Sequence, residues 1–513
     1  MGSIFDVMST ADQTDERKQR LLVESDRHQT RVAVLEDDRL TEIHLERKKR
    51  RSVVGNVFKG RVSRILPGMQ AAFVDIGLAR DAFLFAGDVR EALSDLDELA
   101  DADPQTKEFP PVSIPPIQEL LSAGQELIVQ VVKAPLPNKG ARITTEVTLP
   151  GRYLVFVPTV TNHGISRRIQ EPEERERLRK LTEELVVDAG GLIVRTAGEG
   201  KQFEDFEQDL SLLRAKWAEI EARTQTAAAP SLLHGEEGLA HRFVRDRFTS
   251  EIEELLVDGT EAYDEIVSLT TLIAPWLADR VRLWEEEGTL FEELGIEREI
   301  DKALRSKVWL RSGGYIVINP TEALVAIDVN TGRFVGRKDL ESTVLQTNLE
   351  AVEEIVRQIR LRDLSGIIVI DLIDMAESAN RERVFAALQK ELGKDRAKHQ
   401  VLSLSEFGLV ELTRKRSREN LSRLLTRPCP VCEGSGRIRS LSTICLRLRR
   451  EILARANRLG DRRLVVRVHP EVLRSLHSEQ HDILGELEDA LGDQLALEAD
   501  STLHFEEHHT SEA

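Results

Sequence analysis

The chain has 513 residues, 41% of them hydrophobic and 31% charged, so it is long enough to form several domains that each bury a core. It has no apolar run near the roughly 18 residues of a membrane helix and no apolar signal-peptide core, so we expect a cytoplasmic protein without a transmembrane segment. Its three cysteines are too few for a disulfide framework, and its net charge of -18 argues at first sight against a polyanionic partner.

Positive charge is nevertheless concentrated in two segments. Residues 47–51 read RKKRR, and residues 413–450 carry a series of arginines against only Glu419 and Glu433. Either segment alone is equally well explained as a solvated face. Together they are compatible with a nucleic-acid groove on an otherwise acidic body.

In chain order, the first expected elements are β-strands. Residues 21–45 read as two strands, LLVES and TRVAVLEDDRLTEIHLE, with a DD turn. Between residues 53 and 147, short β-branched runs separated by glycines are typical of a small closed β-barrel of the OB type. An acidic loop containing prolines, at about residues 93–116, interrupts this pattern.

Such barrels bind single-stranded nucleic acid by stacking bases on exposed aromatic side chains that lie beside cations. Phe73 and Phe83 are the candidates for stacking, with Arg61, Arg64 and Lys139 as the cations. Strand phenylalanines more often belong to a core, so the stacking role competes with a purely structural one.

Beyond the barrel, YLVFVPT predicts a strand, EPEERERLRKLTEELVVDAG a helix, and GLIVRTAGEGK a strand that ends at Arg195 and Thr196. A nucleoside-triphosphate loop is excluded because Gln202 follows Gly200 and Lys201 where serine or threonine is needed. Arg195 and Thr196 could instead hold one phosphate through charge-assisted hydrogen bonds. A long helical region without visible chemistry follows to about residue 305.

The central motif lies between residues 313 and 375. The hairpin GGYIVINPTEALVAIDVNTG and the strand SGIIVIDLIDM deliver Asp328 and Asp371, with the helix TNLEAVEEIVRQIRLRDL between them. A strand, a helix and a strand imply a parallel crossover, whose two strands end at the same edge of the sheet. Asp328 and Asp371 should meet there, with Asn330 on the same face if its strand continues by two residues.

Two neighbouring carboxylates repel each other unless one is protonated or a cation lies between them. Mg²⁺ prefers oxygen ligands and keeps several waters, which suits hydrolysis of a phosphodiester. A single aspartate at a strand end is more often a turn or helix cap, and Asp374 is a candidate for an indirect role only. An EF-hand is excluded because Arg333 occupies the loop position that requires glycine.

The segment TRPCPVCEGSGRI contains Cys429 and Cys432 in a C-x-x-C spacing. Structural zinc takes four ligands, but Cys445 follows in an expected helix and no histidine has a ligand spacing. The simplest zinc site would take both cysteines from each of two chains. A redox C-x-x-C pair is the alternative.

Six motifs in this sequence resemble successive landmarks of the ribonuclease E/G family of bacterial endoribonucleases: GNVFKGRVSRILPGMQAAFVDIG, GLIVRTAGEG, ALVAIDVNTGRFVG, QTNLEAVEEIVRQIRLRDLSGIIVIDLIDM, FGLVELTRKRSRE and CPVCEGSGR. The resemblance implies Mg²⁺-dependent cleavage of single-stranded RNA, favouring 5′-monophosphorylated ends and giving 5′-phosphate and 3′-hydroxyl products. It further implies roles in rRNA maturation and mRNA turnover. A catalytically silent RNA-binding or ribosome-assembly factor is the alternative.

The resemblance also implies roles for single residues. The Mg²⁺-binding catalytic pair falls on Asp328 and Asp371, and the supporting asparagine on Asn330. The RNA-binding positions are Phe73, Phe83 and Lys139 in the barrel and Gly151, Val155, Arg195 and Thr196 in a pocket for the 5′ monophosphate. Zn²⁺ would be shared by Cys429 and Cys432 of two chains, in a homodimer or homotetramer.

The implied fold is multidomain α/β and β, with an OB-type RNA-binding barrel and a 5′ sensor inserted in a ribonuclease-H-like subdomain. An α/β catalytic domain, a zinc link and a small α/β domain follow. The expected boundaries are a disordered N-terminus at 1–20, the ribonuclease-H-like subdomain at 21–52 and 241–305, the barrel at 53–147, the sensor at 148–240, the catalytic domain at 306–426, the zinc link at 427–438 and the small domain with its tail at 439–513.

Two parts of the sequence depart from the family pattern. LQTN at residues 345–348 stands where the family's FNTN is expected, beside the catalytic residues. The first 20 residues and the acidic tail EEHHTSEA lie outside the resemblance.

Overall fold

The computed structural model describes residues 18–89, 115–135, 139–160, 163–185, 190–332, 340–402, 405, 408–416, 418–456, 458 and 460–512. They form two compact units, which divide between residues 421 and 422. Most of the acidic loop expected at about 93–116 lies outside the described residues, as does the N-terminus up to residue 17. The expected disorder to residue 20 is wrong at its end, because the first strand begins at Gln19.

The first sheet has the strand order β15-β14-β1-β2-β3. Residues 29–47 form a hairpin that turns at Asp37 and Asp38, both with positive φ, so the region has three strands rather than two. β1 pairs in parallel with β14, and Leu21 is opposite Leu255. The elements are β1 (Gln19–Ser25), β2 (Gln29–Glu36), β3 (Arg39–Arg47), β14 (Ile252–Asp258), β15 (Val281–Leu283), α4 (Leu239–Arg247), α5 (Thr260–Ile273), α6 (Leu290–Glu293) and α7 (Ile296–Ala303).

The expected OB-type barrel is confirmed. Its strands pair in the order β4-β5-β6-β8-β7, and a second pairing of β4 with β7 closes the barrel. β13 (Ser231–His234), from much later in the chain, adds to β4 outside the closed ring. The barrel elements are β4 (Val57–Leu66), β5 (Ala71–Asp75), β6 (Ala82–Phe85), α1 (Ile117–Leu120), β7 (Glu126–Lys133) and β8 (Arg142–Thr144).

A four-stranded sheet of order β11-β12-β10-β9 follows the barrel. Two helices share one apolar core with it, to which Leu178 of α2 and Phe206 of α3 contribute fully buried side chains. The elements are β9 (Leu149–Pro150), β10 (Leu154–Val157), β11 (His163–Ile165), β12 (Gly191–Val194), α2 (Pro172–Leu185) and α3 (Phe203–Thr226).

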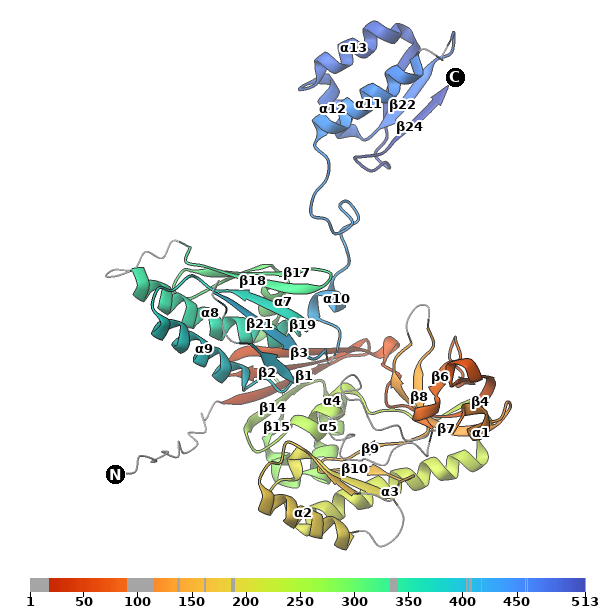
Figure 1. Cartoon of the computed structure of the whole chain (residues 1–513), viewed down its shortest axis with the longest axis vertical. Helices are drawn as coiled ribbons and strands as arrows, with labels where there is room; N and C mark the ends of the chain where they lie inside the picture. Colours follow the sequence, from red (N-terminus) through yellow and green to blue (C-terminus); the bar gives the residue numbers. More distant parts are fainter. Residues whose placement is uncertain are drawn as a thin grey trace, which may run out of the picture. The chain divides into compact units, whose positions relative to one another are not determined.

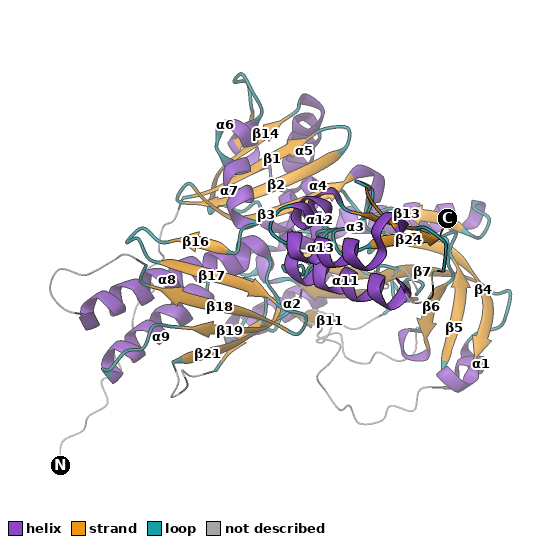
Figure 2. Cartoon of the chain, turned by 90° about the horizontal axis from the view of Figure 1, so that it is seen from above, coloured by secondary structure: helices purple, strands orange, loops and turns teal. Residues whose placement is uncertain are grey.

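The third large sheet has the order β16-β17-β18-β19-β21-β20, and Figure 2 shows most of these strands side by side. Its apolar face packs against α8 and α9, which lie together in Figure 1, and the described parts of the opposite face carry polar and exposed side chains. The elements are β16 (Lys307–Trp309), β17 (Tyr315–Pro320), β18 (Leu324–Asn330), β19 (Gly366–Asp371), β20 (His399–Val401), β21 (Leu409–Arg414), α8 (Leu340–Arg362) and α9 (Ser378–Leu392), and α10 (Leu421–Leu425) lies at the boundary between the two units.

Buried ion pairs join α8 to the first sheet. Arg360 pairs with Glu36 of β2 and with Glu42 of β3, at 3.2 Å from the Glu42 carboxylate. Glu42 also lies 3.3 Å from the Nε2 atom of His44, whose ring packs edge-on against Phe243. Because paired buried charges tolerate little displacement, this network fixes the two sheets relative to each other.

The second unit contains α11 (Leu441–Ala456), β22 (Leu464–Val468), α12 (Pro470–His477), α13 (His481–Leu491), β23 (Leu495–Ala499) and β24 (His508–Glu512). Its three-stranded sheet has the order β23-β22-β24. Residues 503–507, LHFEE, do not form a strand, and the third strand is the following HHTSE of the tail. The tail is therefore part of the small domain's sheet.

Candidate active site

Two aspartates lie directly opposite each other on neighbouring parallel strands. β18 and β19 pair so that Asp328 is opposite Asp371. Strand alternation buries Ile327 and Ile370 against the helices and leaves both aspartates exposed on the other face. β18 continues to Asn330, whose side-chain amide donates to a carboxylate oxygen of Asp328 at 2.7 Å.

The electrostatics of this pair favour a cation. Burial and the neighbouring charges of Asp328 and Asp374 raise the pKa of the Asp371 carboxyl. A cation between the carboxylates removes this repulsion. Among the described residues, no cluster of three or more His, Cys, Asp or Glu could hold a metal ion. Two carboxylates and an amide suit Mg²⁺, which keeps several of its own waters.

Asn348 of α8 supports the turn that follows Asp371. Its fully buried amide donates to the Ile373 carbonyl at 2.8 Å and accepts from the Ile373 backbone N–H at 3.1 Å. The LQTN segment thus retains the asparagine that contacts the site's backbone. Gln346, which departs from the family pattern, is exposed. The sequence does not indicate this role of Asn348, because its partner Ile373 lies 25 residues further along the chain.

The two barrel phenylalanines meet on the outside of the barrel. Phe73 is opposite Phe83 in the β5–β6 ladder, both are half-buried, and their rings are 6.0 Å apart in an edge-to-face arrangement. The guanidinium of Arg64 lies 4.7 Å from the centre of the Phe73 ring, whereas Arg61 pairs with Glu126. Lys139 is exposed. Half-exposed rings beside an arginine are suited to stacking on bases.

Arg195 lies at the end of β12, and its guanidinium donates to the Gly151 carbonyl and to the Asp246 carboxylate at 2.7 Å. Thr196 follows, with its hydroxyl 3.1 Å from that of Ser166. Val155 is half-buried on β10. The structure thus brings Gly151 and Arg195 into contact and places Thr196 beside them.

Asp209 of α3 holds the loop that contains Gly151. Its buried carboxylate accepts hydrogen bonds from the backbone N–H groups of Arg152, Tyr153 and Leu154 at 2.8 to 3.0 Å. A Cβ atom on Gly151 would lie 2.5 Å from an Asp209 oxygen, so any side chain there would displace the carboxylate. The close approach of Asp209 is therefore sufficient to require glycine at position 151, whether or not a ligand binds there.

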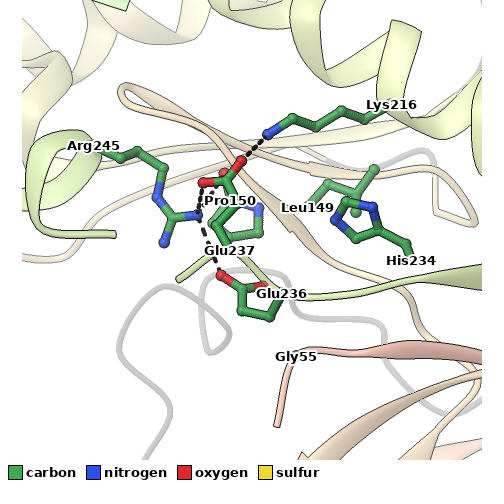
Figure 3. Close-up of a pocket in the computed structure, with 8 residues that line it drawn as sticks. All are labelled: Gly55, Leu149, Pro150, Lys216, His234, Glu236, Glu237 and Arg245. Carbon is green, nitrogen blue, oxygen red and sulfur yellow. Dashed lines mark hydrogen bonds and ion pairs between the residues drawn. The ribbon is translucent and has the colours of Figure 1, made fainter. Parts of the chain in front are cut away.

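Figure 3 shows a charged pocket in which Arg245 pairs with Glu236 and Glu237, and Lys216 pairs with Glu237. Arg245 also donates to Asp246 at 3.0 Å, so this network holds the carboxylate that pairs with Arg195. Burial raises the pKa of Asp246, but the hydrogen bond from Arg245 and the charge of Arg195 outweigh it, and the pKa is lowered overall. Asp246 therefore stays ionised.

In the second unit, Cys429 and Cys432 form an open knuckle. Hydrogen bonds from the backbones of Cys432 and Val431 lower the pKa of the Cys429 thiol, which favours the thiolate that binds metals. His504 of the small domain contacts the Val431 carbonyl at 2.7 Å. Cys445 is buried in the small domain's core, so the knuckle supplies two thiols, half of a tetrahedral zinc site.

Comparison with known proteins shows which protein family the chain belongs to. The model of the Ribonuclease E/G family matches residues 148–417, and the model of the RNase E/G, Thioredoxin-like domain matches residues 428–513. The chain belongs to the ribonuclease E/G family. No described helix is both long and apolar enough to span a membrane.

Individual relatives show which members of the family the chain resembles over its length. The chain is 41% identical over 487 residues to Ribonuclease G of Salmonella typhimurium, which covers 95% of this chain and 98% of that protein. Ribonuclease G of Escherichia coli strain K12 gives the same values. Ribonuclease E of Haemophilus influenzae is 38% identical over 444 residues, 86% of this chain but 46% of that protein. The similarity thus spans the ribonuclease G proteins almost end to end.

Proposed function

We propose that this chain is a Mg²⁺-dependent endoribonuclease that cleaves single-stranded RNA and favours 5′-monophosphorylated ends. As a member of the ribonuclease E/G family it is an endoribonuclease, a hydrolase of RNA phosphodiester bonds. The observation that carries the finer proposal is the direct opposition of Asp328 and Asp371 on the open face of the third sheet. The products would carry a 5′-phosphate and a 3′-hydroxyl. The enzyme would act in rRNA maturation and mRNA turnover in the cytoplasm.

In this proposal each residue at the cut has a separate task. Asp328 and Asp371 hold Mg²⁺, and Asn330 fixes the Asp328 carboxylate through its 2.7 Å hydrogen bond. When bound, the ion supplies Lewis-acid chemistry and neutralises charge on the phosphate. Asn348 positions the backbone that carries Asp371 by holding Ile373.

Two further groups of residues bind the substrate at places other than the cleavage site. Phe73, Phe83 and Arg64 bind bases of the single strand, with Lys139 as an additional cation. Arg195 and Thr196 bind the 5′ phosphate, next to Gly151 and Val155. Because Asp246 already orients the guanidinium of Arg195, little side-chain freedom remains to be lost when the phosphate binds.

The cysteine knuckle supports a separate proposal about assembly. Cys429 and Cys432 supply two thiols where zinc takes four, so the same pair from a second chain completes the site. The protein would be a homodimer joined by Zn²⁺, or a homotetramer of two such dimers.

A cleavage assay tests the catalytic proposal. A 5′-monophosphorylated single-stranded oligonucleotide is incubated with Mg²⁺ and with wild type, Asp328→Asn, Asp371→Asn or, as the matched control, the exposed Asp374→Asn. We expect at least a hundredfold loss in kcat for the first two variants and a smaller one for Asp374→Asn. Wild-type protein without activity, or aspartate variants that cut as wild type does, would leave a catalytically silent RNA-binding factor as the better reading.

A further inference from the structure

The open face of the third sheet carries an aromatic and cationic cluster that none of the roles above uses. Trp309 of β16 is opposite Tyr315 of β17, and Tyr315 is opposite Asn330 of β18. The adjacent row of the same face runs from Lys307 through Val317 to Asp328 and on to Asp371. Residues opposite each other in a ladder share a face, so the two rings, the lysine and the catalytic carboxylates lie on one continuous surface.

The cluster is ordered by its own contacts. The Trp309 and Tyr315 rings are 5.3 Å apart at 62°. The Lys307 ammonium lies 4.2 Å from the Trp309 ring centre and 3.5 Å from that of Tyr315, which are cation–π distances. These contacts hold the rings in place before any ligand arrives.

Trp309 is nevertheless 64% exposed, so core packing does not account for it. β16 is a three-residue edge strand, where an exposed tryptophan favours unwanted association. The next charged surface along the sheet is the carboxylate pair, which a single-stranded RNA must reach to be cut. The chemistry of a ring beside an ammonium matches a base and its phosphate.

We infer that Trp309, Tyr315 and Lys307 form a stacking platform for a nucleotide of the RNA close to the cut. This inference rests on the proposed nuclease function. Neighbouring strands are about 4.8 Å apart, so Trp309, two strands from Asn330, lies about 10 Å from it. The stacked nucleotide is therefore adjacent to the scissile phosphate or one removed from it, and Lys307 pairs with a phosphate of the same segment.

Abasic substrates combined with Trp309 variants test the stacking. A series of 5′-monophosphorylated oligonucleotides carries one abasic nucleotide at each position around the cut. For wild type, an abasic nucleotide at the position that stacks on Trp309 should raise KM roughly five- to a hundredfold, the loss expected for one stacked base. Trp309→Leu, which stays apolar but cannot stack, should raise KM on intact RNA by a similar factor and become insensitive to that position. Trp309→Phe should keep most of the affinity.

The half-buried Trp284, which lies at the end of β15 in the first sheet, is the matched control, and Trp284→Leu should leave KM unchanged. Two results would overturn the platform. One is a wild-type KM for Trp309→Leu. The other is a KM for Trp309→Leu on the abasic substrate that equals the product of the two separate increases, because the two changes would then act independently. Equilibrium binding to the same oligonucleotides, read by fluorescence anisotropy, gives the same comparison if wild type does not cut. The platform and the nuclease activity can therefore fail separately.

Lys307→Gln tests the phosphate contact. Loss of one phosphate contact to a single strand should reduce the slope of log affinity against log salt by about 0.7. The exposed Lys180 of α2 pairs only loosely with Glu176, at 3.9 Å, and Lys180→Gln is the charge-matched control. An unchanged slope for Lys307→Gln would remove the lysine from the platform.

Discussion

Asn348 and Ile373 exchange two hydrogen bonds, one in each direction, across the space between α8 and the turn after β19. Asn348→Ala would leave the backbone N–H and C=O of Ile373 without these partners. We expect a loss of about 1–3 kcal/mol in unfolding free energy, measured by urea denaturation, and a lower kcat with little change in KM. Gln346→Ala, at an exposed position on the same helix, should change neither quantity. A normal kcat in Asn348→Ala would show that the turn does not position Asp371.

Arg195 should determine the preference for a 5′ monophosphate. Its guanidinium is oriented by Asp246, and Arg195→Ala removes the charged fork that would hold the phosphate. We expect the ratio of kcat/KM for 5′-monophosphorylated over 5′-hydroxyl RNA to fall about tenfold or more, the size of a charge-assisted hydrogen bond. The exposed Arg179 of α2 is the control, and Arg179→Ala should keep the ratio. An equal loss on both substrates would refute the sensor role.

His44 should make the protein less stable in mild acid. Burial lowers the pKa of His44 to about 4, against the opposing effect of the hydrogen bond that its ring donates to the Glu42 carboxylate, so the folded protein holds this ring neutral. The unfolded chain takes up the proton near pH 6.5. Between pH 6.5 and 4 the unfolded state thus binds more protons, and stability falls as pH falls through this window. The loss from this group alone is about 2 kcal/mol at pH 5.

Chemical denaturation at pH 7.5 and pH 5 checks this expectation. His44→Gln removes the titrating ring, so its stability should change less between the two pH values than that of wild type. The exposed His28 provides the control, because His28→Gln should retain the wild-type difference. Equal pH dependence in wild type and His44→Gln would contradict the prediction.

Zinc content and oligomeric state test the cysteine knuckle together. Elemental analysis of wild type should give about one zinc per two chains. Cys429→Ser should lose the metal and sediment as a smaller species, whereas Cys445→Ala, which alters only the buried third cysteine, should retain both. A Cys429→Ser protein that keeps the wild-type mass without zinc would show that the knuckle does not join chains.

The convergence of Asp328 and Asp371 could be predicted because it depends on local patterns. The apolar runs of β18 and β19 and the helical spacing of α8 are readable in the sequence, and the crossover rule then places both strand ends together. The register that sets the two aspartates opposite each other needed the structure, because a slip by two residues would keep the same side chains on each face of the sheet.

The roles of Asp209 and Asp246 could not be predicted from local sequence patterns. Asp209 accepts from Arg152, 57 positions away, and Asp246 from Arg195, 51 positions away, so no local spacing marks either carboxylate. β24 is not indicated by the sequence for another reason. It is an edge strand with the polar sequence HHTSE, and an edge strand needs no continuous apolar alternation.

β1 pairs in parallel with β14, a strand that is synthesised much later than β1. The ribosome delivers β1, β2 and β3 first, and these can pair as an antiparallel meander with one side of β1 still open. The partner of that open side ends at Asp258, after the whole barrel and the sheet that follows it have been made. For the time it takes to translate more than 200 residues, the nascent chain therefore carries an unpaired strand edge of the kind that chaperones bind.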